Sequence, residues 1–395
     1  MALFRLAGAV ALALCAAVVP AQPSPAPPAA GAPPRVAASA IPPPAITAPS
    51  YVLLDVTSGQ VIVAQNADEH RDPASLTKLM TAYIVFGVLR GKTITPSQMV
   101  TVSEAAWRAE GSRMFVEPRK AVTVDELLHG MIVQSGNDAS IALAELVAGT
   151  ESAFTERMNK EAKRLGLANT NFTNATGLSQ PQHYASASDL ARLAAALIRD
   201  FPEYYPLYAL KEYRYNNITQ PNRNRLLWID PYVDGVKTGH TETAGWCLIA
   251  SAKRGERRLL SVVLGATSDA ARASESQKLL NYGFQAYDTV QLYQSERPVS
   301  NLRVWKGAAN EVPGGFFADQ YLTLPKGKAD KLALTMAATE PLLAPVAKGQ
   351  RVGTVRVALE GKPVAEFPLI ALQDVPAGGF FDRAWDTVRL WVKQP

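Results

Sequence analysis

A serine and a lysine three residues apart are the first residues of this sequence whose types and spacing could do chemistry. Ser75 and Lys78 lie in the stretch PASLTKLMTAY, where apolar residues follow at helical spacing. Residues three apart share a helix face, so we expect the Lys78 amine close to the Ser75 hydroxyl. A serine hydroxyl becomes a useful nucleophile when a neutral amine takes its proton. The structural alternative is that Ser75 only caps a helix and Lys78 lies on its surface.

Two further triplets bear on the choice between a catalytic and a structural role for Ser75. A lone Ser-x-x-Lys is expected about once or twice by chance in a chain of this length. Here it is followed by Ser135-Gly136-Asn137 and then by Lys237-Thr238-Gly239. This order of motifs is a signature of penicillin-binding proteins and class A β-lactamases. The combination favours catalysis by Ser75 over a purely structural role.

Longer segments make the resemblance specific. The sequence resembles the D-alanyl-D-alanine carboxypeptidases among the low-molecular-mass penicillin-binding proteins in MIVQSGNDAS (131–140), NRNRLLW (222–228), VDGVKTGHTETAGW (233–246) and RASESQKLLNYGF (272–284). The resemblance runs from about Tyr51 to the C-terminus. Gly136 is typical of the carboxypeptidases, whereas class A β-lactamases carry Asp there, and their Glu-x-x-Leu-Asn deacylation motif has no clear counterpart.

The resemblance implies a serine-type D-Ala-D-Ala carboxypeptidase of cell wall metabolism. In this family Ser75 would attack the penultimate D-alanine of a peptidoglycan stem pentapeptide and release the terminal D-alanine, and water would then hydrolyse the acyl-enzyme. The alternatives are a β-lactamase or a D,D-endopeptidase of the same fold, and a non-catalytic peptidoglycan-binding protein. The intact motifs argue against the last of these.

The same resemblance implies a role for each catalytic residue. Lys78 would be the base, and Lys237 would be the neighbouring cation that lowers its pKa. Ser135 would relay a proton to the leaving amine, and Asn137 would orient the substrate and Lys78. Lys78 as the sole base and a relay through Ser135 both fit these residues. The expected catalytic residues are Ser75, Lys78, Ser135 and Asn137.

Substrate binding is expected to use the Lys-Thr-Gly segment and two arginines. Backbone N–H groups of Ser75 and His240 would hold the oxyanion. Thr238, Arg223 and Arg272 are the candidates for the terminal carboxylate, although an arginine is by default a solvated or structural side chain. β-Lactam antibiotics would be covalent inhibitors at this site. The expected substrate-binding residues are Lys237, Thr238, Gly239, His240, Arg223 and Arg272.

Composition and spacing predict no metal, no cofactor and no nucleic acid partner. The 4 histidines show no paired ligand spacing with Cys, Asp or Glu, and no glycine-rich phosphate loop is present. The formal charge of +5 is scattered along the chain without a basic tail. This mild basicity is compatible with an anionic envelope or membrane surface.

The N-terminus predicts export. Residues 1–21 have a short basic start, an apolar run and a small-residue end, as in a secretory signal peptide. Cys15 lies inside it, and Leu14 before that cysteine disfavours a lipoprotein. Its removal would leave Cys247, expected to be a buried strand residue, as the only cysteine and exclude an intramolecular disulfide. Residues 22–49 are rich in Pro and Ala and are expected to form an extended spacer.

The rest of the chain predicts an α+β catalytic domain over residues 50–290. We expect a penicillin-binding/β-lactamase-like transpeptidase domain, in which N- and C-terminal strands share one antiparallel sheet and helices lie between them in sequence. Expected strands cover 51–56, 60–64, 233–239, 245–250 and 259–264. Expected helices cover 75–89, 103–108, 124–132, 139–147, 152–165, 188–199 and 271–288.

Two C-terminal regions follow. Residues 291–376 contain short alternating segments at 320–324, 331–336 and 353–359 and predict a small all-β domain. Residues 377–395 predict an amphipathic helix with Phe381, Trp385, Val388 and Val392 on one side. This helix would lie in a membrane interface, unless it docks on its own domain. We therefore expect a peripheral protein on the periplasmic face of the inner membrane.

Overall fold

The computed structural model describes residues 36–393. The predicted signal peptide, Cys15 and the first part of the predicted spacer lie outside these residues. The helices of the described chain are α1 Lys78–Arg90, α2 Glu104–Trp107, α3 Val124–Val133, α4 Asn137–Ala148, α5 Glu151–Arg164, α6 Ala187–Asp200, α7 Leu226–Ile229, α8 Asp269–Ala286 and α9 Phe380–Lys393. The strands before α8 are β1 Ser50–Asp55, β2 Gln60–Gln65, β3 Met99–Val100, β4 Val122–Thr123, β5 Glu212–Tyr215, β6 Ile218–Pro221, β7 Val233–Thr241, β8 Gly245–Arg254 and β9 Arg257–Ala266.

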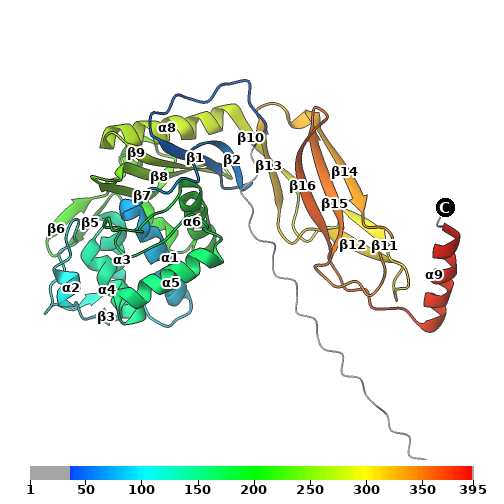
Figure 1. Cartoon of the computed structure of the whole chain (residues 1–395), viewed down its shortest axis with the longest axis horizontal. Helices are drawn as coiled ribbons and strands as arrows, with labels where there is room; N and C mark the ends of the chain where they lie inside the picture. The colour runs from blue at the N-terminus through cyan, green and yellow to red at the C-terminus, as the bar shows by residue number, and fades with distance from the viewer. Residues whose placement is uncertain (1–35, 394–395) are drawn as a thin grey trace, which may run out of the picture. The chain divides into compact units, whose positions relative to one another are not determined.

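A five-stranded antiparallel sheet is the centre of the catalytic region. Its strand order is β2-β1-β9-β8-β7, so a hairpin from the start of this region pairs with three strands from its end (Figure 1). Val52 lies opposite Val262 in this pairing, and both are buried. The predicted α+β class and the predicted sharing of one sheet by distant segments are confirmed.

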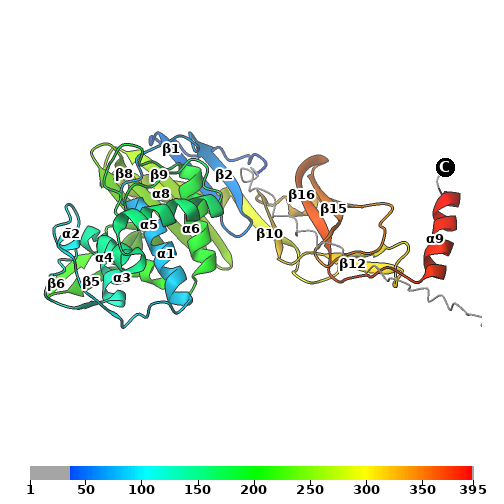
Figure 2. The same ribbon diagram turned by 60° about the horizontal axis from the view of Figure 1, so that its bottom comes forward.

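Helices cover both faces of this sheet. The helix α8 packs on one face, and α1 and α6 lie on the other, where α3, α4 and α5 complete a helical layer (Figure 1). The small hairpin of β5 and β6 packs beside α3 (Figure 2). This layering places two separate apolar cores on the two faces of the sheet.

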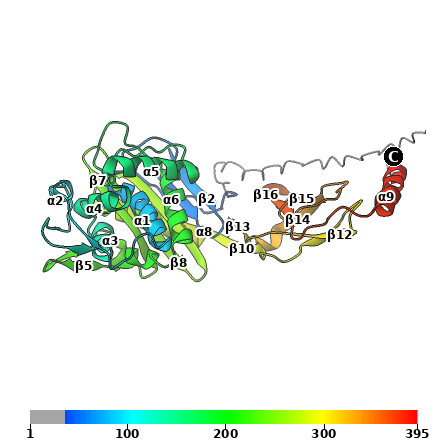
Figure 3. The same ribbon diagram turned by 90° about the horizontal axis from the view of Figure 1, so that it is seen from below.

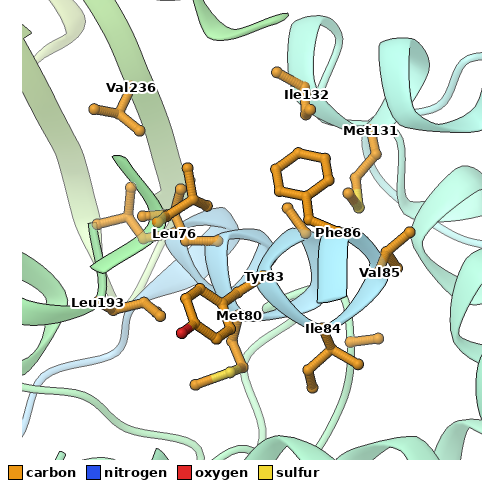
Figure 4. Close-up of a cluster of buried hydrophobic side chains, with 14 of the residues drawn as sticks. Leu76, Met80, Tyr83, Ile84, Val85, Phe86, Met131, Ile132, Leu193 and Val236 are labelled. Atoms are coloured by element: carbon orange, nitrogen blue, oxygen red, sulfur yellow. The ribbon is translucent and has the colours of Figure 1, made fainter. Parts of the chain in front are cut away.

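The helix α1 runs through the middle of the helical layer. Most of its side chains are apolar and nearly all are buried, with Met80, Phe86 and neighbouring Leu76 inside the larger core (Figure 4). A helix that is apolar on all sides is stable only where other elements surround it. The buried position of α1 fixes its first residue, Lys78, inside the protein.

The last part of the predicted spacer packs against the catalytic region. The backbone N–H of Val36 donates to Val61 O over 3.1 Å, and the Tyr282 hydroxyl donates to Ile41 O over 3.1 Å. Buried Glu275 on α8 accepts hydrogen bonds from the backbone N–H and hydroxyl of Thr47 and from the N–H of Ala48. Residues 36–49, which we call the N-terminal strap, are thus part of the folded domain rather than free spacer.

The chain after α8 forms β-structure, as predicted. Its strands are β10 Tyr287–Tyr293, β11 Ser300–Arg303, β12 Glu311–Gly315, β13 Gln320–Pro325, β14 Leu332–Ala338, β15 Arg351–Leu359 and β16 Lys362–Ala371. β10 pairs with β13, and five others form a sheet in the order β11-β12-β16-β15-β14 (Figure 3). A separate core formed mainly by Val and Leu side chains stabilises this sheet.

The terminal helix α9 leaves most of its apolar side chains exposed. Phe381 is 84% exposed, Trp385 60% and Val388 54%. Asp386 is buried and accepts a hydrogen bond from the backbone N–H of Lys306 over 2.6 Å. Within residues 36–393, no helix has the length and hydropathy of a membrane-spanning segment.

Candidate active site

Ser75 lies in a tight turn directly before the central helix. The 3-10 turn Ala74–Thr77 carries Ser75, and α1 begins at Lys78 rather than at Ser75 as predicted. Ala74, the first residue of this turn, has a positive φ of 45°. The N-cap positions of this turn and of α1 are Pro73 and Thr77, and no described backbone N–H donates to the Ser75 hydroxyl, so the alternative role of Ser75 as a helix cap is wrong. The Lys78 Nζ lies 3.0 Å from the Ser75 Oγ.

Lys78 is enclosed by three oxygen atoms. Its Nζ is 2.6 Å from Asn137 Oδ1, 2.6 Å from Thr176 O and 3.0 Å from Ser75 Oγ. The Asn137 amide nitrogen donates to Glu110 O over 2.6 Å, which leaves its oxygen toward the lysine. These carboxamide and peptide oxygens only accept hydrogen bonds, so a neutral amine would use its two N–H groups there. Its lone pair would then face the Ser75 hydroxyl.

The surroundings favour that neutral amine. Burial lowers the pKa of Lys78 to about 7, and the charge of Arg223 adds to this effect. We expected Lys237 to supply the neighbouring charge, and the two charges do oppose each other, because burial, and next the charge of Lys78, lower the pKa of Lys237 as well. Arg223 is a further cation that was not predicted in this role. Because Lys78 and Lys237 are both buried in one small site, a positive charge on either one disfavours a positive charge on the other.

Ser135 and Lys237 face the cavity as a second pair. The Lys237 Nζ donates to Ser135 Oγ over 2.9 Å and to Thr238 O over 3.0 Å. Ser135 lies in the short loop between α3 and α4 and has a φ of 64°, an unusual value for a residue with a side chain. Asn137 is the first residue of α4, and its backbone N–H donates to Ser112 O. The loop therefore directs both polar side chains of the triplet into the site.

The structure brings all of the predicted site residues together. A cavity of about 320 Å³ is lined by Ser75, Gly111, Ser112, Ser135, Arg223, Thr238, Gly239, His240, Trp246 and Arg272. The other three predicted residues lie directly behind this lining, because Lys78, Asn137 and Lys237 contact it through the hydrogen bonds described above. Residues separated by more than 190 positions in the sequence thus share one polar cavity.

The two predicted arginines are held differently. Arg272 is 3% exposed, donates to Gly239 O and Cys247 O on adjacent strands, and pairs with Asp269 on its own helix. Arg223 forms no hydrogen bond or ion pair with any other residue in the described range, and its side chain reaches the cavity. Arg272 therefore stiffens the wall, while the guanidinium of Arg223 is free to meet an anion.

Several contributors were not predicted from the sequence. Thr176 acts through a backbone carbonyl, which no side-chain motif reveals. Asp138 is buried and accepts hydrogen bonds from the backbone N–H groups of Met114, Phe115, Val116 and Ala139. It therefore holds residues 114–116 against the start of α4. Trp246 lies in the segment 233–246 that carries the resemblance. Its position in the cavity wall is evident only in the structure, where it pairs with His240 on the neighbouring strand.

Metal and thiol chemistry find no support in the site. Among the residues that the structure describes, no group of three His, Cys, Asp or Glu side chains could hold a metal ion. Cys247 is fully buried on β8, as predicted, and burial raises the pKa of its thiol to about 11. A buried thiol of this kind is not a nucleophile.

Comparisons with known proteins agree with this geometry. Residues 37–268 match the D-alanyl-D-alanine carboxypeptidase family, and residues 287–377 match the penicillin-binding protein 5 C-terminal domain. The chain is 45% identical over 359 residues to D-alanyl-D-alanine carboxypeptidase DacC of Escherichia coli, with 89% of this chain and 90% of the relative covered. It is 43% identical to DacA of Haemophilus influenzae, over 89% of this chain and 91% of the relative.

Solved structures give the same result. The crystal structure of penicillin-binding protein 5 from H. influenzae superposes with a TM-score of 0.83 and 44% identity, covering 85% of this chain and 99% of that one. Penicillin-binding protein D2 of Listeria monocytogenes in the ampicillin-bound form superposes with a TM-score of 0.57 and 29% identity, covering 62% and 100%. The first similarity extends through both the catalytic region and the β-structured region.

Proposed function

This chain belongs to the D-alanyl-D-alanine carboxypeptidase family, and from that premise we propose that Ser75 is its nucleophile and Lys78 its general base. The contact that carries this proposal is the Lys78 Nζ at 3.0 Å from the Ser75 Oγ. With the pKa of Lys78 lowered to about 7, a large fraction of the amine is neutral at neutral pH. The substrate is the stem pentapeptide of peptidoglycan, and the product is the tetrapeptide with free D-alanine.

Acylation begins with proton transfer. The Ser75 Oγ–H gives its proton to the Lys78 lone pair while the oxygen attacks the carbonyl of the penultimate D-alanine. Asn137 Oδ1 and Thr176 O hold the two other positions around Nζ and so stabilise the ammonium that forms. The geometry supports Lys78 as the base in this step, because the amine contacts the nucleophile directly.

Departure of D-alanine needs a second proton. We assign it to Ser135, whose hydroxyl lies 2.9 Å from the Lys237 Nζ. Ser135 passes this proton to the leaving amine and takes in its place the one that Lys78 removed from Ser75, so that both residues return to their starting forms while Lys237 donates a hydrogen bond to the Ser135 oxygen. Backbone N–H groups of Ser75 and His240 would hold the oxyanion, and the same groups would serve again when water hydrolyses the acyl-enzyme.

The terminal carboxylate is assigned to Arg223 and Thr238. Arg223 is the guanidinium in the cavity without an internal partner in the described chain, and a free guanidinium binds a carboxylate through paired donors. Thr238 follows Lys237 on β7 and lines the cavity. Arg272 supports this pair from behind, because its donors already hold β7 and β8.

The function is tested by product analysis. The full chain without its signal peptide is incubated with a purified muropeptide pentapeptide, and mass spectrometry should find the tetrapeptide and one D-alanine, with no product when penicillin is added first. A second measurement follows the covalent penicillin adduct. We expect a half-life of minutes or longer, since acyl-enzymes of a penicillin target accumulate. Rapid turnover of penicillin would instead identify a β-lactamase, and cleavage of cross-linked dimers alone would identify an endopeptidase.

We also propose that the enzyme acts at the periplasmic face of the inner membrane, held by α9. The exposed Phe381, Trp385 and Val388 and the aromatic pair Phe380 and Trp391 suit the boundary between lipid and water. The signal peptide at residues 1–21 would deliver the chain to the periplasm. The exposure of these side chains supports the membrane over docking on the domain.

Removing the tail tests this placement. A chain ending at Pro376 is expected to change from the membrane pellet to the soluble fraction, because it loses all five of these apolar side chains. Its carboxypeptidase activity on a soluble pentapeptide should stay within about twofold, since no residue of α9 lines the cavity. A matched full-length variant with Thr387→Ala should remain in the pellet. Sedimentation of the truncated chain with membranes would contradict the proposal.

A further inference from the structure

A carboxylate three residues before the nucleophile ties together three segments of the active site. Asp72 is partly buried, and its Oδ1 accepts the backbone N–H of Ala74 over 2.9 Å. Its Oδ2 accepts the hydroxyls of Ser179 over 2.5 Å, Thr243 over 2.5 Å and Thr241 over 3.0 Å. We call these four side chains the Asp72 cluster. Thr241 and Thr243 lie in the quoted segment 233–246, but neither the three catalytic triplets nor the proposed mechanism uses any of the four side chains.

The hydroxyl donors come from two different walls of the site. Ser179 lies in the loop that carries Thr176, the residue whose carbonyl holds Lys78. Thr241 ends β7, the strand that carries the Lys-Thr-Gly triplet, and Thr243 lies in the turn that follows. Asp72 itself precedes the turn of the nucleophile. The carboxylate is therefore the point at which the base, the nucleophile and the substrate-binding strand are joined.

The turn that needs this support is strained. Ala74 has a φ of 45°, in the left-handed region that residues with a side chain rarely adopt. It is enclosed by glycines on both sides: a Cβ at Gly177 would lie 1.8 Å from Ala74 O, and one at Gly239 would lie 3.1 Å from Ala74 Cβ. The hydrogen bond from Ala74 N to Asp72 holds the residue in this conformation.

We propose that Asp72 is a positioning residue for the reaction: it holds the strained turn of Ser75 against the Lys78 loop and β7, and it thereby sets the distance between nucleophile and base. The carboxylate is suited to this because one oxygen can accept three hydroxyl donors. Hydrogen bonds from Ser179, Thr243, Ala74 and Thr241 outweigh the effect of burial and keep the pKa of Asp72 below its ordinary value, so it stays ionised. A misplacement of about 1 Å between reacting groups can cost about 100-fold in rate.

This inference rests on the proposed function, and the experiment separates the two. The full chain is mixed with a fluorescent penicillin, and both the second-order rate constant of labelling and the final stoichiometry are measured. Asp72→Asn replaces the accepting oxygen by an amide that donates. We expect labelling to slow by about 10- to 100-fold while the final stoichiometry stays that of the unmodified protein. Asp68→Asn makes the same chemical change at an exposed position four residues earlier and should leave the rate unchanged.

Substitutions at Thr243 keep the test valid if Asp72→Asn folds poorly. Thr243→Val removes the hydroxyl and should slow labelling by about 3- to 10-fold, whereas Thr243→Ser retains it and should restore the rate to within about twofold. The double variant Asp72→Asn/Thr243→Val should be no slower than Asp72→Asn alone, because both remove one interaction.

The labelling results distinguish failure of the positioning role of Asp72 from failure of the proposed function. Labelling of Asp72→Asn at the rate of Asp68→Asn would overturn the positioning role. An unchanged rate with a reduced final stoichiometry would also overturn it, since that pattern means loss of folded protein only. A failure of the unmodified chain to be labelled would instead reject the proposed function.

Discussion

Ser75→Ala is expected to abolish both release of D-alanine and covalent labelling by penicillin. No other hydroxyl contacts the Lys78 amine within the described part of the chain, so none can replace the nucleophile. Removal of the nucleophile of a serine hydrolase typically costs about 10⁶-fold in rate. The measurement is D-alanine release from the pentapeptide, with labelling by fluorescent penicillin followed in parallel.

The control must show that the variant is folded. Ser75 is partly exposed in a short turn, and alanine fits the space of serine, so the melting temperature should stay within a few degrees. Ser152→Ala, at an exposed helix position, is the matched change and should keep full activity. Normal labelling of Ser75→Ala would reject the assignment of the nucleophile.

The rate of acylation should fall as the pH drops through about 7, the value to which burial and Arg223 lower the pKa of Lys78. The sign follows from the role of the amine: only its neutral form accepts the proton of Ser75, and protonation removes that form. Well below this pH the rate should fall about tenfold per pH unit, and well above it the rate should level off. Single-turnover labelling by penicillin measures this step without product release.

Substitutions identify the titrating group. Lys78→Arg places a permanently charged side chain at the base position, and we expect acylation to slow by about 10²- to 10⁴-fold. His240 also lines the cavity, so His240→Gln is the necessary control. If the acylation rate of His240→Gln still falls at low pH, the titrating group is Lys78. A rate independent of pH across this range would contradict it.

Local sequence patterns were sufficient for most of the fold. The hairpin of β1 and β2 follows from two runs rich in strand-forming residues on either side of Thr57-Ser58-Gly59, and the middle helices follow from their 3.6-residue periodicity. The expected end of α8 at residue 288 was two residues late, because Tyr287 begins β10 and pairs with Pro325. Such an ending depends on a partner strand distant in the sequence.

The β5–β6 hairpin was not predicted, although the sequence contains a pattern that favours its turn. The turn of the β5–β6 hairpin has Asn216 and Asn217, both with positive φ, and asparagine tolerates this conformation better than most residues. In the candidate site, the motifs and the resembling segments named ten residues that lie at or directly behind one cavity, and their roles stay predictions. The motifs could not reveal the carbonyl of Thr176 or the role of Asp72, because both depend on how three loops meet in space.

The N-terminal strap changes where the catalytic unit should be considered to begin. Composition suggests a boundary near residue 50, yet a recombinant form started there would leave buried Glu275 without the three donors that Thr47 and Ala48 supply. It would also uncover the apolar surface beneath Val36 and Ile46. Shortened forms for crystallisation or antibiotic screening should therefore begin no later than residue 36. A removable affinity tag can be placed before that residue.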